Sequence, residues 1–428
     1  MGQLFFRCWY IMIFFFIDYN EVMIMKRSIF LRQMLVSLMA MLLLLSCTLS
    51  AGADGMDPIS EEGAQSTSFP FGAEDDSLHL PCKSAVLMEA GTGAILYRQN
   101  ADEALPPASV TKIMTLLLVM EAVDTGMVHL DDTVTVSANA ASMGGSQVYL
   151  EEGEQMALED LLKSVIIASA NDAAVALAEY VAGSVPSFVE KMNQRAQGLG
   201  MKETVFENVT GLDDTAERHL TSAHDIALMS AELIKHEAIL KYSSIWMDTI
   251  RNGEFGLTNT NRLVRFYPGC TGLKTGSTSK AGFCVSVTAE RDGFSLICVI
   301  MGAESRDVRN ATATQLLDWG FANYGLYSAE SGKLDPLPVT GGSQSACPVA
   351  YGAFQAVLPK SMLSAVEVKI DLPDSVVAPI RKGDEIGRVE FWSGETCIGE
   401  IPIVVEERVD KINFFEILTR MLARFLLI

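Results

Sequence analysis

Residues 109–123 read SVTKIMTLLLVMEAV, and this run is apolar on nearly every side of a helix. A surface helix keeps one side polar, whereas a helix that is apolar all round is buried. Pro106 and Pro107 come just before the run. The stretch therefore predicts a helix at the centre of a globular domain.

The segments around this helix predict a mixed domain. Before it, residues 84–89 alternate in polarity and meet residues 94–97 across Gly91-Thr92-Gly93, as in a β-hairpin. After it come helical patterns, then two strand patterns joined at Arg291-Asp292-Gly293. The helical ranges are 158–168, 172–181, 186–199, 223–235 and 311–324, and the strand ranges are 282–289 and 294–301. We expect an α/β (α+β) catalytic domain over 82–328, with an antiparallel sheet and a helical insert.

Two segments flank this domain. Residues 54–81 are rich in Gly, Ser, Asp and Glu, which predicts a disordered linker. Residues 335–408 contain only short strand patterns between Gly, Pro and Asp, with candidates at 366–370, 385–392 and 397–405. This second segment predicts a small β-sandwich domain.

The buried helix begins with Ser109-Val110-Thr111-Lys112, which places a serine and a lysine one turn apart on one face. Burial favours the neutral form of a lysine, and a neutral amine can take the proton of a nearby hydroxyl. Ser109 also lies at a helix N-terminus, where backbone N–H groups favour a developing oxyanion. The alternative is a capping serine beside a lysine that reaches solvent, and this pattern alone does not decide.

Two further motifs supply complementary groups. In Ser169-Ala170-Asn171, between two helical patterns, the hydroxyl could relay a proton and the amide could hold the lysine or a substrate. Ser137-Ala138-Asn139 has the same letters, but it follows a strand-like 133–136 in a polar loop, so we favour the copy at 169. Lys274-Thr275-Gly276 offers an ammonium and a hydroxyl for a carboxylate, and its glycine lets a peptide approach the strand backbone.

Together, SxxK, SxN and KTG in this order resemble the D-alanyl-D-alanine carboxypeptidases, low-molecular-weight penicillin-binding proteins with the serine β-lactamase/transpeptidase-like fold. The resemblance extends from about Lys83 to the C-terminus. It includes PPASVTKIMT (106–115), GGSQVYL (144–150), NVTGL (208–212), TSAHDIA (221–227), NTNRLVRFYPGCTGLKTG (259–276), LLDWGF (316–321) and, in the β-rich segment, IRKGDEI (380–386). It implies a serine peptidase without a cofactor that removes the terminal D-alanine from peptidoglycan pentapeptide stems and is inhibited by β-lactams.

The resemblance also implies a role for each matching residue. Ser109 would be the acylated nucleophile, Lys112 its base and Ser169 a proton relay to Lys112. Asn171 would bind the substrate amide. The backbone N–H groups of Ser109 and Ser277 would form the oxyanion hole.

The substrate carboxylate would be recognised on the other side of the site. Lys274 would attract it and Thr275 would donate a hydrogen bond to it, with Gly276 beside them. Arg309 is a possible second carboxylate contact, the alternative being a surface arginine at a helix start. Position 277 varies in the family, so Ser277 could alter the affinity for penicillins.

The composition excludes several other classes of function. The chain has 428 residues and a formal net charge of −21, without the basic face that a nucleic-acid partner requires. HExxH, CxxC and P-loop spacings are absent, so we expect no metal and no P-loop nucleotide site. His219 and His224 are expected to be structural, because lysine fills the role of the base. We interpret six cysteines as free thiols: Cys82, Cys270, Cys284, Cys298, Cys347 and Cys397.

The N-terminal segment predicts export. The basic pair Lys26-Arg27 precedes an apolar run at 34–45 and small residues, which is the order of a signal peptide within residues 1–53. A transmembrane anchor is the alternative, but the run is shorter than the usual ~20 residues. We expect Met25 to be the true start, because signals open with their basic residues. Lipid attachment at Cys47 stays open.

Residues 410–428 predict an amphipathic helix that binds a membrane. Asn413, Glu416, Arg420 and Arg424 share one narrow stripe, and apolar residues cover the rest of the helix. Such a helix suits a membrane interface, and docking on the protein's own core is the alternative. We expect an exported enzyme that is peripheral on the outer face of the bacterial cytoplasmic membrane.

Related activities remain possible at this point. A β-lactamase needs an additional carboxylate to activate the deacylating water, and no acid in residues 207–219 has the expected pattern. A D,D-endopeptidase shares the three motifs but usually lacks the C-terminal domain. A penicillin-binding scaffold without turnover would not need the intact set of serines and lysines.

Overall fold

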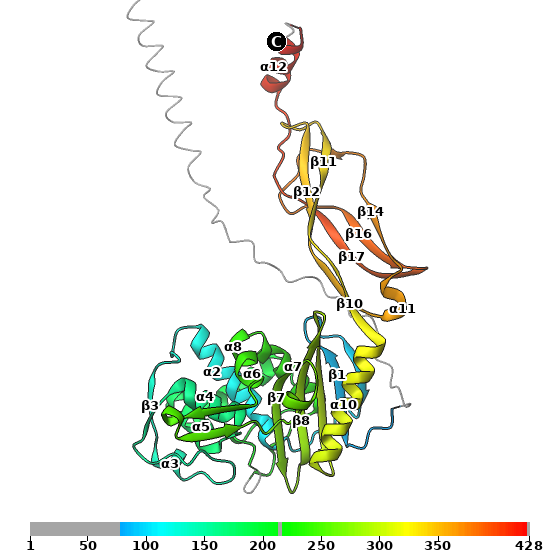
Figure 1. The fold of residues 1–428 in the computed structure, drawn as a ribbon. Coiled ribbons are helices and arrows are strands. Elements are labelled where there is room, and N and C mark those ends of the chain that lie inside the picture. The colour runs from blue at the N-terminus through cyan, green and yellow to red at the C-terminus, as the bar shows by residue number, and fades with distance from the viewer. Residues whose placement is uncertain (1–77, 213–215, 426–428) are drawn as a thin grey trace, which may run out of the picture. The chain divides into compact units, whose positions relative to one another are not determined.

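The structure is a computed structural model that describes residues 78–212 and 216–425 (Figure 1). The predicted signal peptide, Met25, Cys47 and most of the predicted linker lie outside the described residues. The end of that linker is part of the fold, because Leu80 is buried and Leu78 packs against the same hydrophobic cluster. The folded domain therefore begins by residue 78 and not at the predicted residue 82.

The catalytic domain is built on a five-stranded antiparallel sheet with the strand order β2-β1-β9-β8-β7. The β1–β2 hairpin and the β8–β9 pair confirm the two predicted strand pairs. The KTG residues lie inside β7, at an edge of this sheet. The strands are β1 (Ser84–Glu89), β2 (Ile95–Gln99), β7 (Cys270–Thr278), β8 (Gly282–Arg291) and β9 (Phe294–Ala303).

Both faces of the sheet are covered. In β1, Val86 and Met88 enter one hydrophobic cluster, which includes the buried residues of α2 (Lys112–Asp124). Leu87, between them, points to the other face and packs in a second cluster with residues of α10 (Arg306–Asn323), which lies along the sheet in Figure 1. Because side chains alternate across a strand, a strand covered on both faces is apolar throughout.

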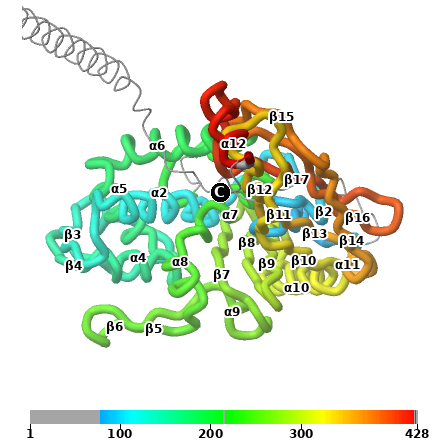
Figure 2. The backbone as a smooth tube through the Cα atoms, turned by 90° about the horizontal axis from the view of Figure 1, so that it is seen from above, coloured from blue at the N-terminus to red at the C-terminus, as the bar shows by residue number. Residues whose placement is uncertain are grey.

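The predicted helices are confirmed. The run at 109–123 forms the 3₁₀ helix η1 (Ala108–Thr111) and then α2, which is buried along most of its length. The remaining helices of the domain are α3 (Ala138–Ala141), α4 (Leu158–Ile167), α5 (Asn171–Ala182), α6 (Val185–Gly198), α7 (Ala223–Ile234), α8 (Glu237–Ser243), η2 (Arg251–Gly253) and α9 (Leu263–Phe266). Two short hairpins complete it: β3 (Thr133–Thr135) with β4 (Gln155–Ala157), and β5 (Met247–Ile250) with β6 (Phe255–Thr258). Figure 2 shows α9 beside β7.

The second domain is the predicted β-sandwich. A six-stranded sheet with the order β14-β16-β17-β12-β11-β15 faces the two-stranded β10–β13 sheet across one hydrophobic cluster. Phe354 and Phe391, one from each sheet, stack with their ring centroids 4.1 Å apart. The elements are β10 (Tyr324–Ala329), β11 (Gly332–Thr340), β12 (Ala346–Tyr351), β13 (Phe354–Pro359), α11 (Lys360–Leu363), β14 (Val366–Asp371), β15 (Val376–Val377), β16 (Glu385–Ser393) and β17 (Thr396–Val405).

The boundary between the domains differs from the prediction. Residues 324–328 were expected to close the catalytic domain, but they belong to β10, which pairs with β13. Tyr327 of β10 also contacts the rings of Phe354 and Phe391. The pairing joins residues 324–329 to the β-rich segment, ahead of the predicted start at 335.

The tail forms the predicted helix, α12 (Phe414–Phe425). Its apolar side chains are exposed: Phe414 by 71%, Phe415 by 76% and Phe425 by 90%. On the polar stripe, Arg420 donates to the carbonyl oxygens of Gly342 and Ser343. Within the described residues, no helix has both the length and the apolarity to cross a membrane. The six described cysteines are free thiols, as predicted.

Candidate active site

A pocket of about 560 Å³ lies where η1 meets the edge strand β7. Six of the nine predicted site residues line it: Ser109, Ser169, Thr275, Gly276, Ser277 and Arg309. The other three, Lys112, Asn171 and Lys274, are buried at 0%, 1% and 1% exposure. The structure therefore brings residues from three distant motifs together.

Lys112 is held beside Ser109. Its Nζ lies 2.9 Å from Ser109 Oγ, 2.6 Å from Asn171 Oδ1 and 2.9 Å from the carbonyl oxygen of Thr210. Burial, and next the charge of Lys274, hold the pKa of Lys112 well below its usual value, and the Asp172 carboxylate acts in the opposite direction.

This geometry suits a base. Asn171 Oδ1 and the Thr210 carbonyl can only accept hydrogen bonds, so they take the two N–H groups of a neutral lysine. The remaining lone pair of Lys112 then faces the hydroxyl of Ser109. The alternative of a lysine that reaches solvent is wrong, because Lys112 is fully buried.

A tight turn carries Ser169 and Asn171. Helix α4 ends at Ile167 and α5 begins at Asn171, and Ser169 between them has a φ of 63°. Such left-handed conformations are costly for residues other than glycine and are concentrated at functional sites. Asn171 Oδ1 holds Lys112, and its Nδ2 donates to the Gly144 carbonyl at 2.7 Å. Of the two roles open for Asn171, its contacts favour holding the lysine.

The second SxN copy has structural contacts. Ser137 caps α3 by accepting the N–H of Ala140 at 3.0 Å. Ser137 and Asn139 both donate to the carboxylate of Glu179 on α5, at 2.5 and 2.7 Å. These bonds join α3 to α5 and leave the copy at 169 to line the pocket.

Two basic side chains belong to this part of the site: Lys274 in β7 and Arg309 in α10. The Nζ of Lys274 donates to the Thr275 carbonyl at 3.0 Å, and burial, followed by the charge of Arg309, lowers the pKa of Lys274 to about 7. Thr275 Oγ1 lines the pocket and donates to Thr260 Oγ1 at 2.9 Å. Arg309 is 3% exposed and donates to the Cys284 carbonyl at 3.3 Å, so it is not a surface arginine. Burial lowers the pKa of Arg309 to about 10.

Position 276 requires glycine for a structural reason that the sequence did not reveal. A Cβ at this position would lie 2.8 Å from both the Pro107 carbonyl and the Ser109 backbone nitrogen. Glycine therefore lets β7 pack directly against the backbone of η1. The expected approach of a substrate peptide to this glycine stays a prediction, and Gly276 lines the pocket.

The two histidines occupy packing positions. His219 Nδ1 accepts a hydrogen bond from the Glu207 N–H at 3.0 Å. In a neutral ring the proton is then on Nε2, which lies 2.7 Å from Thr111 Oγ1 and donates to it. His224 Nδ1 lies 3.3 Å from a carboxylate oxygen of Asp102. Neither histidine lines the pocket.

Several lining residues have no role in the sequence analysis. Most of them lie in the segment 246–266, and the second half of this segment belongs to a stretch that resembles the family. The residues are Trp246, Thr258, Asn259, Thr260, Arg262 and Phe266, together with Ser146 and Arg306 from other parts of the chain. No Asp or Glu is among the described lining residues, while Asp213 and Asp214 lie in the gap 213–215. No described group of three or more His, Cys, Asp or Glu side chains could hold a metal ion.

The sequence and the fold match known proteins. Residues 71–305 match the D-alanyl-D-alanine carboxypeptidase family, and residues 335–411 match the C-terminal domain of penicillin-binding protein 5. D-alanyl-D-alanine carboxypeptidase DacF of Bacillus subtilis is 41% identical over 82% of this chain and 92% of its own length. DacC of Escherichia coli is 34% identical over 81% of this chain and 89% of its own length.

Solved structures agree. Penicillin-binding protein 5 of Haemophilus influenzae superposes with a TM-score of 0.70 at 32% identity, covering 78% of this chain and 98% of the other. Penicillin-binding protein D2 of Listeria monocytogenes, in its ampicillin-bound form, has a TM-score of 0.53 at 33% identity, covering 57% of this chain and 99% of the other.

Proposed function

This chain belongs to the D-alanyl-D-alanine carboxypeptidase family, and from that premise we propose how its residues divide the reaction. The enzyme is a serine peptidase that removes the terminal D-alanine of peptidoglycan stem peptides through an acyl-enzyme. The observation that carries the assignment is the 2.9 Å contact between Lys112 Nζ and Ser109 Oγ. Ser109 is the nucleophile and Lys112 is its base.

In the first step, Ser109 Oγ attacks the carbonyl carbon of the penultimate D-alanine while its proton passes to Lys112 Nζ. The backbone N–H groups of Ser109 and Ser277 stabilise the oxyanion. Gly276 supports this arrangement, because it allows β7 to lie against the Ser109 backbone. The C–N bond then breaks, and Ser169 relays the proton from Lys112 to the leaving amine.

The departing D-alanine carries a carboxylate. Thr275 and Arg309 line the pocket and bind this group directly. Lys274 lies behind them and attracts it by charge. In the second step, water attacks the carbonyl carbon of the ester and gives a proton to Lys112. The ester bond to Ser109 Oγ then breaks, Lys112 returns the proton to Ser109 Oγ, and the shortened stem peptide leaves with a new terminal carboxylate.

β-Lactams present a strained amide beside a carboxylate, so Ser109 should open the ring and keep the adduct. Intact-mass measurement and peptide mapping of penicillin-treated protein should locate one adduct on Ser109. An adduct on another residue, or none on folded protein, would contradict the assignment. Ser109→Ala is the control, and it should remain unmodified.

We also propose that the protein is exported through the signal within residues 1–53 and is held peripherally on the outer face of the cytoplasmic membrane by α12. The exposed apolar side chains of α12 support this proposal. Arg420 and Arg424 belong to the stripe that the sequence predicts to be polar, and the structure has Arg420 donating to the Gly342 carbonyl. An uncleaved signal or a lipid on Cys47 is the competing anchor.

A further inference from the structure

The loop that contains residues 144–150 supplies two carbonyl groups to Asn171. Gly144 O accepts from Asn171 Nδ2, and Ser146 O accepts from the Asn171 backbone N–H, both at 2.7 Å. The oxygen of the same amide holds Lys112 Nζ at 2.6 Å. The position of the proposed base therefore depends on where this loop lies.

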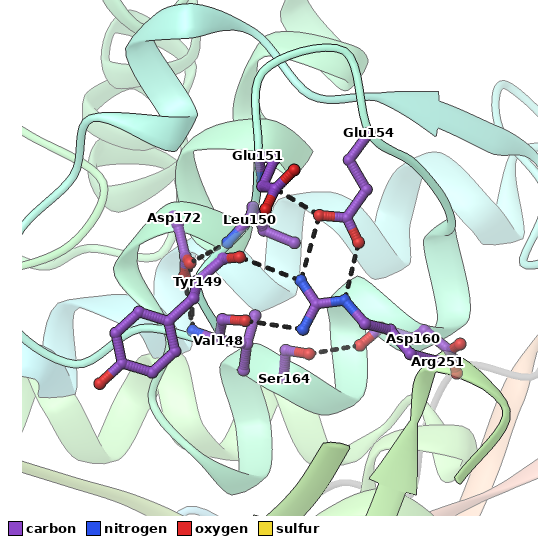
Figure 3. Close-up of polar contacts among 9 residues, drawn as sticks. All are labelled: Val148, Tyr149, Leu150, Glu151, Glu154, Asp160, Ser164, Asp172 and Arg251. Atoms are coloured by element: carbon purple, nitrogen blue, oxygen red, sulfur yellow. Dashed lines mark hydrogen bonds and ion pairs between the residues drawn. The ribbon is translucent and has the colours of Figure 1, made fainter. Parts of the chain in front are cut away.

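Residues 148–150 of the loop are held from two sides (Figure 3). The Asp172 carboxylate, which is buried, accepts the N–H groups of Val148 and Leu150, each at 3.1 Å. The guanidinium of Arg251 donates to the carbonyl oxygens of Val148 at 2.9 Å and Tyr149 at 3.1 Å. Asp172 therefore binds N–H groups of this short segment, and Arg251 binds its carbonyl groups.

The loop is constrained and Arg251 is itself fixed. Tyr149 has a φ of 57°, a left-handed conformation that persists only where surrounding contacts determine it. Arg251 donates to both carboxylate oxygens of Glu154, at 2.8 and 3.1 Å, and the Glu151 N–H donates to the same carboxylate at 3.0 Å. A planar guanidinium can bind one carboxylate and two carbonyls at once, whereas an ammonium cannot reproduce this geometry.

We propose that Arg251 is a positioning residue for the reaction: it holds the loop whose carbonyls fix Asn171 and thereby keeps Lys112 within reach of Ser109. Arg251 is not among the pocket-lining residues, and it comes from η2, more than a hundred residues after the loop that it holds. It acts on the reaction only through other residues. The inference rests on the proposed role of Lys112 as the base.

The test is steady-state D-alanine release by Arg251→Ala and Arg251→Lys in the otherwise intact chain. Arg251→Ala should lower kcat by about ten- to a hundredfold, since small misplacements of catalytic groups cost this much, and should change KM by less than about twofold. Arg251→Lys keeps a charge for Glu154 but loses the planar fork, so its kcat should be intermediate. Hydrogen exchange at the Val148 and Leu150 amides should accelerate in both variants.

Arg195 offers a matched control. It donates at 2.7 Å to both Glu121 and Glu232, and its side chain is 27% exposed against 24% for Arg251. Arg195→Ala should lower Tm to a similar degree and leave kcat unchanged. Equal losses of kcat in the two alanine variants would overturn the inference, as would an unchanged kcat in folded Arg251→Ala. Normal acylation in Lys112→Ala would instead contradict the proposed base, so the two failures are distinguishable.

Discussion

The start of α2 and the tail helix α12 break the usual rules of burial in opposite ways. Lys112, an ionisable side chain, is 0% exposed, while Phe425, an aromatic side chain, is 90% exposed. Lysine is almost never fully buried without partners, and large apolar residues seldom gather on a surface without a purpose. Both exceptions fit the proposed function, in which Lys112 acts on a stem peptide and α12 binds a lipid surface.

The two regions also differ in how the fold supports them. Lys112 has three polar partners at 2.6–2.9 Å, which compensate for the lost hydration of its side chain. The apolar face of α12 lacks comparable cover, with Phe414 and Phe415 both more than 70% exposed. The proposed base is therefore already held in place inside the fold, whereas the proposed anchor would be covered only by a lipid surface.

The largest effect is expected from removing the amine of Lys112, the buried member of this pair of regions. Lys112→Ala should slow acylation of Ser109 by β-lactam by up to about 10⁴-fold, the usual upper range for loss of a general base. Stopped-flow or intact-mass kinetics would measure this. Lys163→Ala, a charge change on α4, is the control and should acylate normally. Acylation of Lys112→Ala at the rate of the unchanged enzyme would show that Lys112 is not the base.

The next largest effect concerns the exposed side. Deleting Asp410–Ile428 should lower the membrane partition coefficient about a thousandfold. This change corresponds to ~4 kcal/mol of binding free energy, which the burial of a few apolar side chains at ~1.5–3 kcal/mol each can supply. Activity on soluble D-alanyl-D-alanine peptides should stay within about twofold. Fractionation of signal-processed protein with and without the tail measures the change.

Two outcomes of this truncation would contradict the proposal. If the truncated protein stays with the membrane, the anchor is at the N-terminus. If truncation abolishes activity on soluble peptides, α12 is part of the catalytic fold. High salt should release little of the intact form, because the apolar contact dominates.

A smaller effect is expected in the pH profile. The proposed mechanism needs neutral Lys112 and charged Lys274, so kcat/KM should rise as Lys112 loses its proton and fall as pH passes the Lys274 pKa of about 7. Lys274→Gln should raise KM. It should also move the acidic limb to higher pH, because the charge of Lys274 lowers the pKa of Lys112. An acidic limb that stays in place would mean that the two lysines are not coupled.

Local patterns predicted most of the elements near the site. The alternation before and after Gly91-Thr92-Gly93 gave the β1–β2 hairpin, and the apolar run at 109–123 gave the central buried helix. The motifs indicated which residues would meet, since each supplies a different chemical group. The family resemblance then assigned roles that the patterns alone left open.

Long-range contacts explain what the sequence could not reveal. The pairing of β10 with β13 determines the domain boundary, and nothing in residues 324–328 indicates that partner. The Thr210 carbonyl is a backbone group, so no residue type marks it as a partner of Lys112. Gly276 was noticed, but its reason lies in the close approach of Ser109, which requires the assembled sheet.

The free cysteines make the chemistry of this protein selective. Burial raises the pKa of Cys270 and Cys284 to about 11 and that of Cys82 to about 12. The thiolate is the reactive form, so these sulfur atoms carry almost no nucleophilic character at neutral pH. An electrophile that enters the protein therefore meets Ser109 as a prepared nucleophile and these thiols as inert packing groups. A reactive probe built on a strained amide can then report on a single hydroxyl without interference from these sulfur atoms.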